Sequence, residues 1–200
     1  MALSDALSRV EIAAIEEWRA WLAANHRQRD SIWLVTWKKR SGGPHVSYDA
    51  AVEEALCFGW IDSRPAKLDD KRSMVLFSPR KRGSGWSAIN KRRIDRLVAE
   101  GRMHPSGLAV LESAKANGAW EAFDAAEAMA VPDDLTAALA KSKPAARNFD
   151  AFPPGVRKAI LQWIGTAKRP ETRAARVRDT VEKAAKNIRA NQWRRPDGKG

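Results

Sequence analysis

The chain is poor in cysteine and histidine, and it lacks long apolar runs. A single cysteine, Cys57, among 200 residues excludes an internal disulfide. The three histidines are widely separated, and there is neither a His-x-x-x-His pair nor a Cys-x-x-Cys pair, so we expect no metal site. No apolar run approaches the roughly 20 residues of a membrane-spanning helix, so we expect no membrane span.

Signals for export and for common catalytic chemistry are also missing. Residues 1–10 have neither the basic start nor the apolar stretch of a signal peptide, which predicts a cytoplasmic protein. The sequence contains no Walker loop, no Gly-x-Gly-x-x-Gly motif and no Gly-x-Ser-x-Gly turn. It therefore assigns no catalytic residue and no cofactor, and it leaves enzymatic activity and the oligomeric state open.

Positive charge is concentrated in two segments of a chain whose net charge is +12. Residues 64–102 contain 12 basic and 4 acidic side chains, and residues 156–200 contain 13 and 4, whereas the remainder is mildly acidic. Such segregation favours an anionic partner, either a small anionic molecule or a nucleic acid. The alternative is a solvated basic surface without a partner.

The spacing of apolar residues predicts an α+β fold. Strands are expected at residues 31–38 and 72–78, with a short strand or turn at 60–63. Helices are expected at residues 11–24, from Ser47 to Gly59, from Ser87 to Gly101, and at 105–118. We therefore expect a small, antiparallel sheet of about three strands with helices packed on it.

After Phe77 every signal is helical, and four prolines lie near expected helix starts, at positions 132, 144, 153 and 170. We expect an α+β domain at residues 1–130, a helical C-terminal module at residues 131–190 and a frayed tail at residues 191–200.

One cluster in the middle of the chain has the composition of a binding site. Trp60 and Trp86 lie beside glycines and polar residues, where an indole can line a pocket. Three cations precede the loop Gly83–Gly85, which leads to a helix start that can bind an anion. The predicted ligand-binding residues are Trp60, Asp62, Arg64, Arg80, Ser84, Trp86, Ser87 and Asn90. The alternatives are core tryptophans, a mobile loop and an aspartate that caps a turn.

Nucleic-acid binding is a second hypothesis, because basic residues crowd two expected helices and such residues give sequence-independent affinity for phosphates. The residues concerned are Lys91, Arg92, Arg93, Arg96, Arg169, Arg173, Arg176 and Arg178. A third hypothesis is an enzyme that acts on an anionic small molecule, with Asp62 as its acid or base.

Several motifs resemble those of the YdeI/OmpD-associated family, which is also called bacteriocin-protection. The motifs lie at residues 58–63, 77–80, 84–90, 101–103, 132–139, 163–168 and 171–176. The resemblance implies a small helical C-terminal module and a role in tolerance of bacteriocins or a related stress. It assigns no reaction and no cofactor, so our leading hypothesis is a cytoplasmic protein that binds an anionic ligand.

Overall fold

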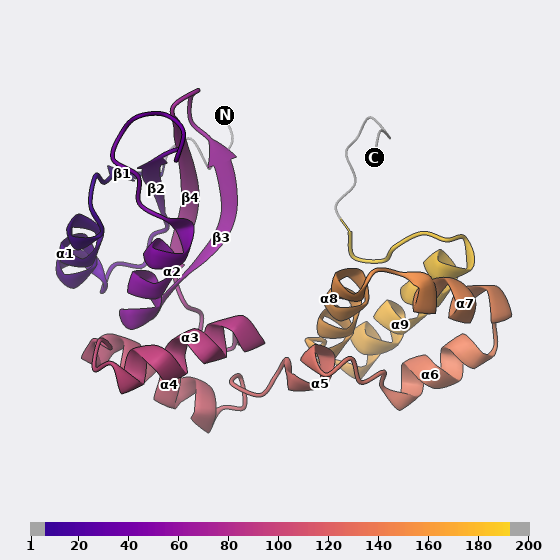
Figure 1. The fold of residues 1–200 in the computed structure, drawn as a ribbon. Coiled ribbons are helices and arrows are strands. Elements are labelled where there is room, and N and C mark those ends of the chain that lie inside the picture. Colours follow the sequence, from indigo (N-terminus) through magenta and orange to yellow (C-terminus); the bar gives the residue numbers. More distant parts are fainter. Residues whose placement is uncertain (1–6, 193–200) are drawn as a thin grey trace. The chain divides into compact units, whose positions relative to one another are not determined.

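A computed structural model describes residues 7–192, which form two compact units (Figure 1). The first unit comprises the residues up to Ser84 together with Ile89–Trp120, and the second comprises Gly85–Ala88 and the residues from Glu121 onward. The division along the chain therefore falls at residue 120, whereas the sequence suggested residue 130. The predicted tail at residues 191–200 lies almost entirely outside the described residues.

The first unit contains a mixed sheet of four strands in the order β1-β2-β4-β3. The strands are β1 (Arg9–Glu11), β2 (Ile32–Trp37), β3 (Trp60–Lys67) and β4 (Arg72–Pro79). Only β1 and β2 pair in parallel; the other two pairings are antiparallel. The α+β class is confirmed, but the expectation of about three antiparallel strands is wrong because β1 adds a parallel edge strand.

Helices α1 (Ile15–Asn25) and α2 (Tyr48–Cys57) pack on one face of this sheet (Figure 1). Trp18 of α1 lies 5.4 Å from the ring of Phe77 in β4, and its indole N–H donates to the carbonyl of Ala51 in α2 at 3.0 Å. Phe77 is fully buried, and burial of such a side chain contributes about 1.5–3 kcal/mol. The face that carries Phe77 is therefore the core face of the sheet.

Both ends of α2 have the residues that their geometry requires. The hydroxyl of Ser47 accepts a hydrogen bond from Ala50 N–H at 3.2 Å, so it caps the helix as the sequence predicted. Gly59 has φ +80°, which confirms that glycine ends α2 in the left-handed conformation. Helix α4 (Pro105–Ala116) then approaches closely, since a Cβ at Gly107 would lie 2.1 Å from the carbonyl oxygen of Cys57. Helix α3 (Ala88–Ala99) precedes it.

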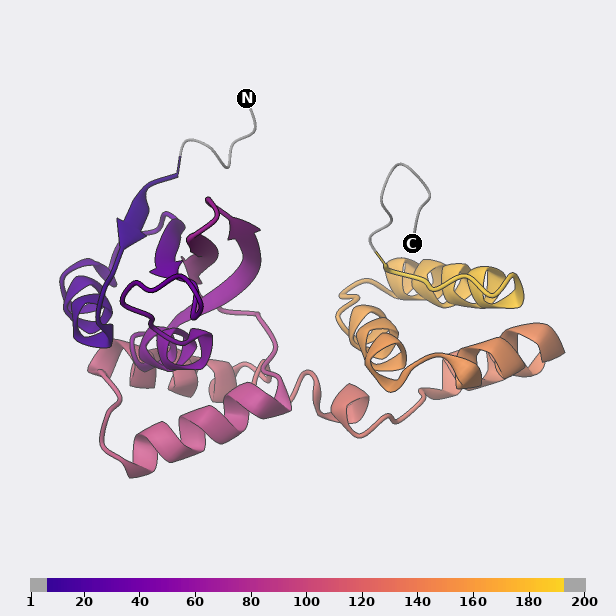
Figure 2. The same ribbon diagram turned by 45° about the horizontal axis from the view of Figure 1, so that its top comes forward.

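The described part of the second unit is helical (Figure 2). Its helices are α5 (Asp124–Glu127), α6 (Asp133–Ala140), α7 (Lys143–Ala151), α8 (Pro154–Gly165) and α9 (Pro170–Ala185). The last three have proline in the first turn, as the sequence predicted. Phe149, Ile160 and Ile164 are fully buried in a core that extends from residue 126 to residue 190. Within residues 7–192, no helix is long and apolar enough to cross a membrane.

Candidate functional site

Asp62 lies in a hydrogen-bonded pair with Tyr48, the only tyrosine of the protein. In β3, Asp62 is opposite Phe77 and so faces the helix-covered side of the sheet. Tyr48 is the first residue of α2, and its hydroxyl donates to Asp62 Oδ2 at 2.5 Å. Partial burial, followed by this hydrogen bond, raises the pKa of Tyr48 to about 12. Tyr48 is therefore a protonated donor near neutral pH, although half of the residue (51%) is exposed.

Next to this pair is a pocket of about 110 Å³, which we call the sheet pocket. It lies on the core face of β2 and β4, beside the start of α2. Five of its lining residues are apolar: Leu34, Val46, Ala51, Val75 and Phe77. Polar or amphipathic residues complete it: Thr36, Trp37, Lys38, His45, Tyr48 and Ser73. Tyr48 thus belongs both to the pocket and to the pair with Asp62.

Lys38, one of the residues that line the sheet pocket, carries a positive charge. The ammonium of Lys38 donates to the carbonyl oxygens of Asp69 and Asp70, at 2.7 and 3.0 Å. In the part of the chain that the structure describes, no carboxylate forms an ion pair with Lys38. Its charge is therefore held in place by backbone dipoles and is not neutralised by contact.

The segment after β2 is packed so that it forms a wall of the pocket. A Cβ at Gly43 would lie 2.2 Å from the ring of Trp37, so only glycine allows this close approach. His45 Nδ1 lies 2.7 Å from the carbonyl oxygen of Trp37. In the neutral ring Nδ1 must then carry the proton, which leaves Nε2 as an acceptor.

Two arginines flank the Tyr48–Asp62 pair. Arg93 of α3 forms an ion pair with Asp49 and donates from Nη1 to Asn90 Oδ1 at 2.9 Å. Arg80, which follows β4, is partly buried; burial lowers its pKa to about 10, and the charge of Asp62 opposes this shift. The charges of Asp62 and Arg80 thus interact, and Asn90 contacts Arg93; that Asp62, Arg80 and Asn90 form one ligand site stays a prediction.

Ser84 contributes its backbone to this region. Its carbonyl oxygen accepts a hydrogen bond from Arg80 Nη2 at 3.4 Å, and its N–H donates to Lys81 O at 2.9 Å. The turn at residues 81–84 therefore holds the guanidinium of Arg80 through a main-chain oxygen.

Two other predicted residues of the first unit lie elsewhere. Trp60 is fully buried; its indole N–H donates to His26 O at 3.2 Å, and its ring meets Trp21 edge-on at 5.7 Å. The guanidinium of Arg64 lies 5.3 Å from the ring of Trp33. Because Trp33 is opposite Leu76, and Leu76 and Phe77 face opposite sides, Arg64 lies on the other face of the sheet.

The remaining predicted residues, Trp86 and Ser87, belong to the second unit. Trp86 is buried. Ala88 N–H, the first amide of α3, donates to the carboxylate of Glu127 at 3.3 Å. A carboxylate of the protein itself thus contacts the helix start at which the sequence predicted an anion. That Trp60 and Trp86 share one concave site stays a prediction.

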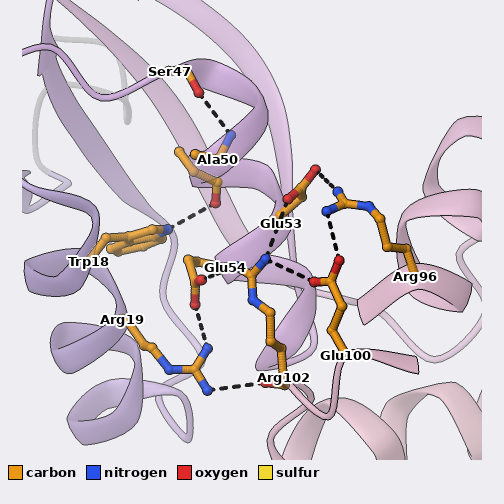
Figure 3. Close-up of polar contacts among 10 residues, drawn as sticks. Trp18, Arg19, Ser47, Ala50, Glu53, Glu54, Arg96, Glu100 and Arg102 are labelled. Carbon is orange, nitrogen blue, oxygen red and sulfur yellow. Dashed lines mark hydrogen bonds and ion pairs between the residues drawn. The ribbon is translucent and has the colours of Figure 1, made fainter. Parts of the chain in front are cut away.

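A second polar arrangement, the Glu54 network, lies at the other end of α2 (Figure 3). Glu54, a buried carboxylate, forms ion pairs with Arg19 of α1 at 2.6 Å and with Arg102. Arg19 also donates to Arg102 O at 3.1 Å. Further ion pairs extend the network to Glu53, Arg96 and Glu100. Every side-chain oxygen of Glu54 has an arginine partner, as a structural role requires.

Most cations of the nucleic-acid hypothesis make intramolecular contacts. Lys91 lies over the ring of Trp120 at 5.0 Å, and Arg96 belongs to the Glu54 network. In α9, Arg173 pairs with Asp134 at 2.7 Å, and Arg176 donates to the carbonyl of Trp163. The remaining predicted cations are exposed: Arg92, Arg169 and Arg178. These contacts stabilise helix packing. Much of the positive charge therefore has a structural role that requires no nucleic acid.

Comparisons with known proteins identify two regions of the chain. A family model described as a domain of unknown function, DUF8412, matches residues 10–110. A second, described as "Bacteriocin-protection, YdeI or OmpD-Associated", matches residues 128–187. No curated protein and no solved structure matches the chain. Within residues 7–192 there is no group of three or more His, Cys, Asp or Glu side chains that could hold a metal ion.

Proposed function

We propose that this chain, which belongs to the DUF8412 family through residues 10–110 and carries a YdeI- or OmpD-associated domain at residues 128–187, binds a small anionic molecule in its first unit. One observation carries the proposal: Tyr48 lines the sheet pocket while Asp62 fixes its hydroxyl, and Lys38 supplies a positive charge at the pocket edge. A preformed pocket with a few convergent polar groups is the usual form of a small-molecule site.

The predicted site residues have different roles in this proposal. Asp62 acts through Tyr48, whose hydroxyl it orients. Arg80 and Asn90 belong to the flank of the same region, where Asn90 orients Arg93 and Arg80 adds positive charge near Asp62. Lys38 and Tyr48 are the binding residues that the sequence did not single out.

The proposed cellular role rests on the family description and on charge. A protein of net charge +12 repels a cationic peptide, so direct capture of such a bacteriocin is unfavourable. Protection against bacteriocins or a related stress is therefore indirect in our proposal, through the anionic ligand. A cytoplasmic location is part of the same proposal.

A thermal-shift screen of small carboxylates and phosphates tests this function. A ligand that binds only the folded state raises the melting temperature, and at about 100 times its Kd it stabilises by about 2.7 kcal/mol. Lys38→Met should weaken binding about 10- to 100-fold, as expected for a lost hydrogen bond to a charged group. Lys39→Met, a change at the exposed neighbour, is the control. If no anion raises the melting temperature, or if both variants bind equally, the proposal is wrong.

A further inference from the structure

We propose that the ligand is a small carboxylate with a compact apolar tail, with its carboxylate at Lys38, Thr36 and Ser73 and its tail against Leu34, Val75 and Phe77. This inference rests on the proposed anion-binding function and specifies the class of molecule that the sheet pocket accepts.

The polarity of the sheet pocket changes along the strands. In the pairing of β2 with β4, Thr36 is opposite Ser73. Two residues along the strands, the apolar residues Leu34 and Val75 are opposite each other, and Phe77 follows Val75 on the same face. Side chains two residues apart share one face of a strand and are separated by about 7 Å. A ligand that lies along the strands therefore meets polar groups at one end and apolar groups at the other.

The polar end has donors for one carboxylate. An ammonium has three N–H bonds, and Lys38 uses two of them on the carbonyls of Asp69 and Asp70, which leaves one. Thr36 and Ser73, which also line the pocket, each carry a hydroxyl. These donors and a single positive charge match a monoanion with two oxygens, whereas a phosphate dianion calls for more donors and more charge.

The apolar end is formed by buried side chains. Leu34, Ala51 and Phe77 are buried. An engineered apolar cavity of roughly 150 Å³ holds benzene, so the sheet pocket, at about 110 Å³ in all, encloses a tail of roughly four carbon atoms, and the proposed carboxylate lies outside that volume, at the edge beside Lys38. An isobutyl group has this size, which makes isovalerate a suitable probe.

Tyr48 provides the readout, because it is the only tyrosine and it lines the pocket. Protein labelled with fluorotyrosine gives one fluorine resonance, which is titrated with isovalerate, acetate and isovaleramide. Isovalerate should bind about 10- to 100-fold more tightly than acetate, since each buried methylene contributes roughly a factor of four. It should also bind at least about tenfold more tightly than the neutral amide.

Two variants separate the ends of the pocket. Val75→Phe fills the apolar end and should remove the advantage of isovalerate over acetate, while acetate binding stays. Ser73→Ala removes a donor and should weaken both acids by a similar factor. The comparison of the three probes in the unmodified sequence decides the proposal even if Val75→Phe fails to fold.

Each contrary result has a distinct meaning. If acetate binds as tightly as isovalerate, the tail inference is wrong and the anion-binding function stands. If isovaleramide binds as tightly as isovalerate, the anionic function is wrong although the pocket binds apolar groups. If none of the three probes shifts the resonance, the carboxylate inference is wrong, and the thermal-shift screen with phosphates decides whether the anion-binding function stands.

Discussion

Helix α2 carries polar side chains at both ends, and the two ends differ in how far the protein satisfies them. At the C-terminal end, the carboxylate of Glu54 is 6% exposed and meets arginines on both oxygens. At the N-terminal end, Tyr48 is 51% exposed, pairs with Asp62 and lines a pocket. The first arrangement is saturated by protein groups, and the second leaves a surface for another molecule. One helix therefore separates a structural contact from a candidate binding site.

The largest effect on the free energy of unfolding is expected at the C-terminal end of α2, where protein groups satisfy the carboxylate of Glu54. Glu54→Gln removes the charge that Arg19 and Arg102 share. Loss of one member of a buried ion pair costs about 3–5 kcal/mol, and the partial exposure of both arginines (42% and 35%) places the expected loss near the lower limit, about 3 kcal/mol. Chemical denaturation measures this loss.

The matched control for that prediction is Glu100→Gln. Glu100 is an exposed member of the same network, and exposed pairs contribute about 0.2–1 kcal/mol. Equal losses in the two variants would show that burial of Glu54 does not distinguish it, and the contrast between the ends of α2 would then fail.

The next largest effect is on the pKa of Tyr48, at the N-terminal end of α2, and it is measured spectroscopically. Asp62→Asn removes the negative charge that faces the hydroxyl of Tyr48. The pKa of Tyr48 should then fall part of the way from about 12 toward 10, because burial, the largest cause of the shift, remains. The near-ultraviolet absorbance of tyrosinate measures this directly, since no other tyrosine is present.

The same pair predicts how stability depends on pH. A pKa that is raised in the folded state gives stability that is fully present below pH 10 and is lost as pH rises through about 12. Asp62→Asn should reduce this alkaline loss. Asp70→Asn, at a side chain that is 93% exposed, is the control and should leave the titration of Tyr48 unchanged. An unchanged titration in Asp62→Asn would show that the hydrogen bond is absent in solution.

Much of the fold follows from local patterns, and the missed parts have identifiable causes. The strands near residues 31–38 and 72–78 were predicted because β-branched and aromatic residues fill them. Strand β1 has one apolar residue among three, so it lacks a periodic signal. Strand β3 contains Pro65 next to an irregularity in its register, and proline argues against a strand in a sequence. Both strands therefore form because they pair with neighbouring strands in the folded sheet, and not because of a local sequence pattern.

Less of the candidate site was predictable. Asp62 stood out because glycine, tryptophan and serine surround it in the sequence, and Arg80 because it begins a run of three cations before a glycine-rich loop. Tyr48 looked like an ordinary first residue of a helix, because its contact with Asp62 joins residues 14 positions apart. Trp60 has a similar local sequence to Trp86, but its indole is satisfied by the carbonyl of His26, a partner 34 residues away. Such long-range contacts leave no local signal.

The smallest effect is expected at His104, close to the saturated end. Its ring stacks on Phe58 at 4.7 Å and lies 4.8 Å from His26. Burial, followed by the charges of His26, Arg19 and Arg27, lowers the pKa of His104 below 6.5. The neutral ring caps α4, because Nδ1 accepts from Ser106 N–H at 3.2 Å. Protonation therefore removes the hydrogen-bond acceptor that caps α4, and it places a positive charge near His26, Arg19 and Arg27.

The sign of the pH effect follows from the lowered pKa. The unfolded chain protonates His104 near pH 6.5, whereas the folded protein resists, so stability is present above pH 6.5 and declines as pH falls through the folded pKa. His104→Asn keeps a capping side chain and removes the titration, because asparagine is a favourable N-cap. Its unfolding free energy should be somewhat lower than that of the unmodified protein at pH 8, because the ring contacts with Phe58 and His26 are lost, and it should depend less on pH below about 6.5. Denaturation series across that range test this, and parallel curves for the two proteins would rule out a contribution from His104.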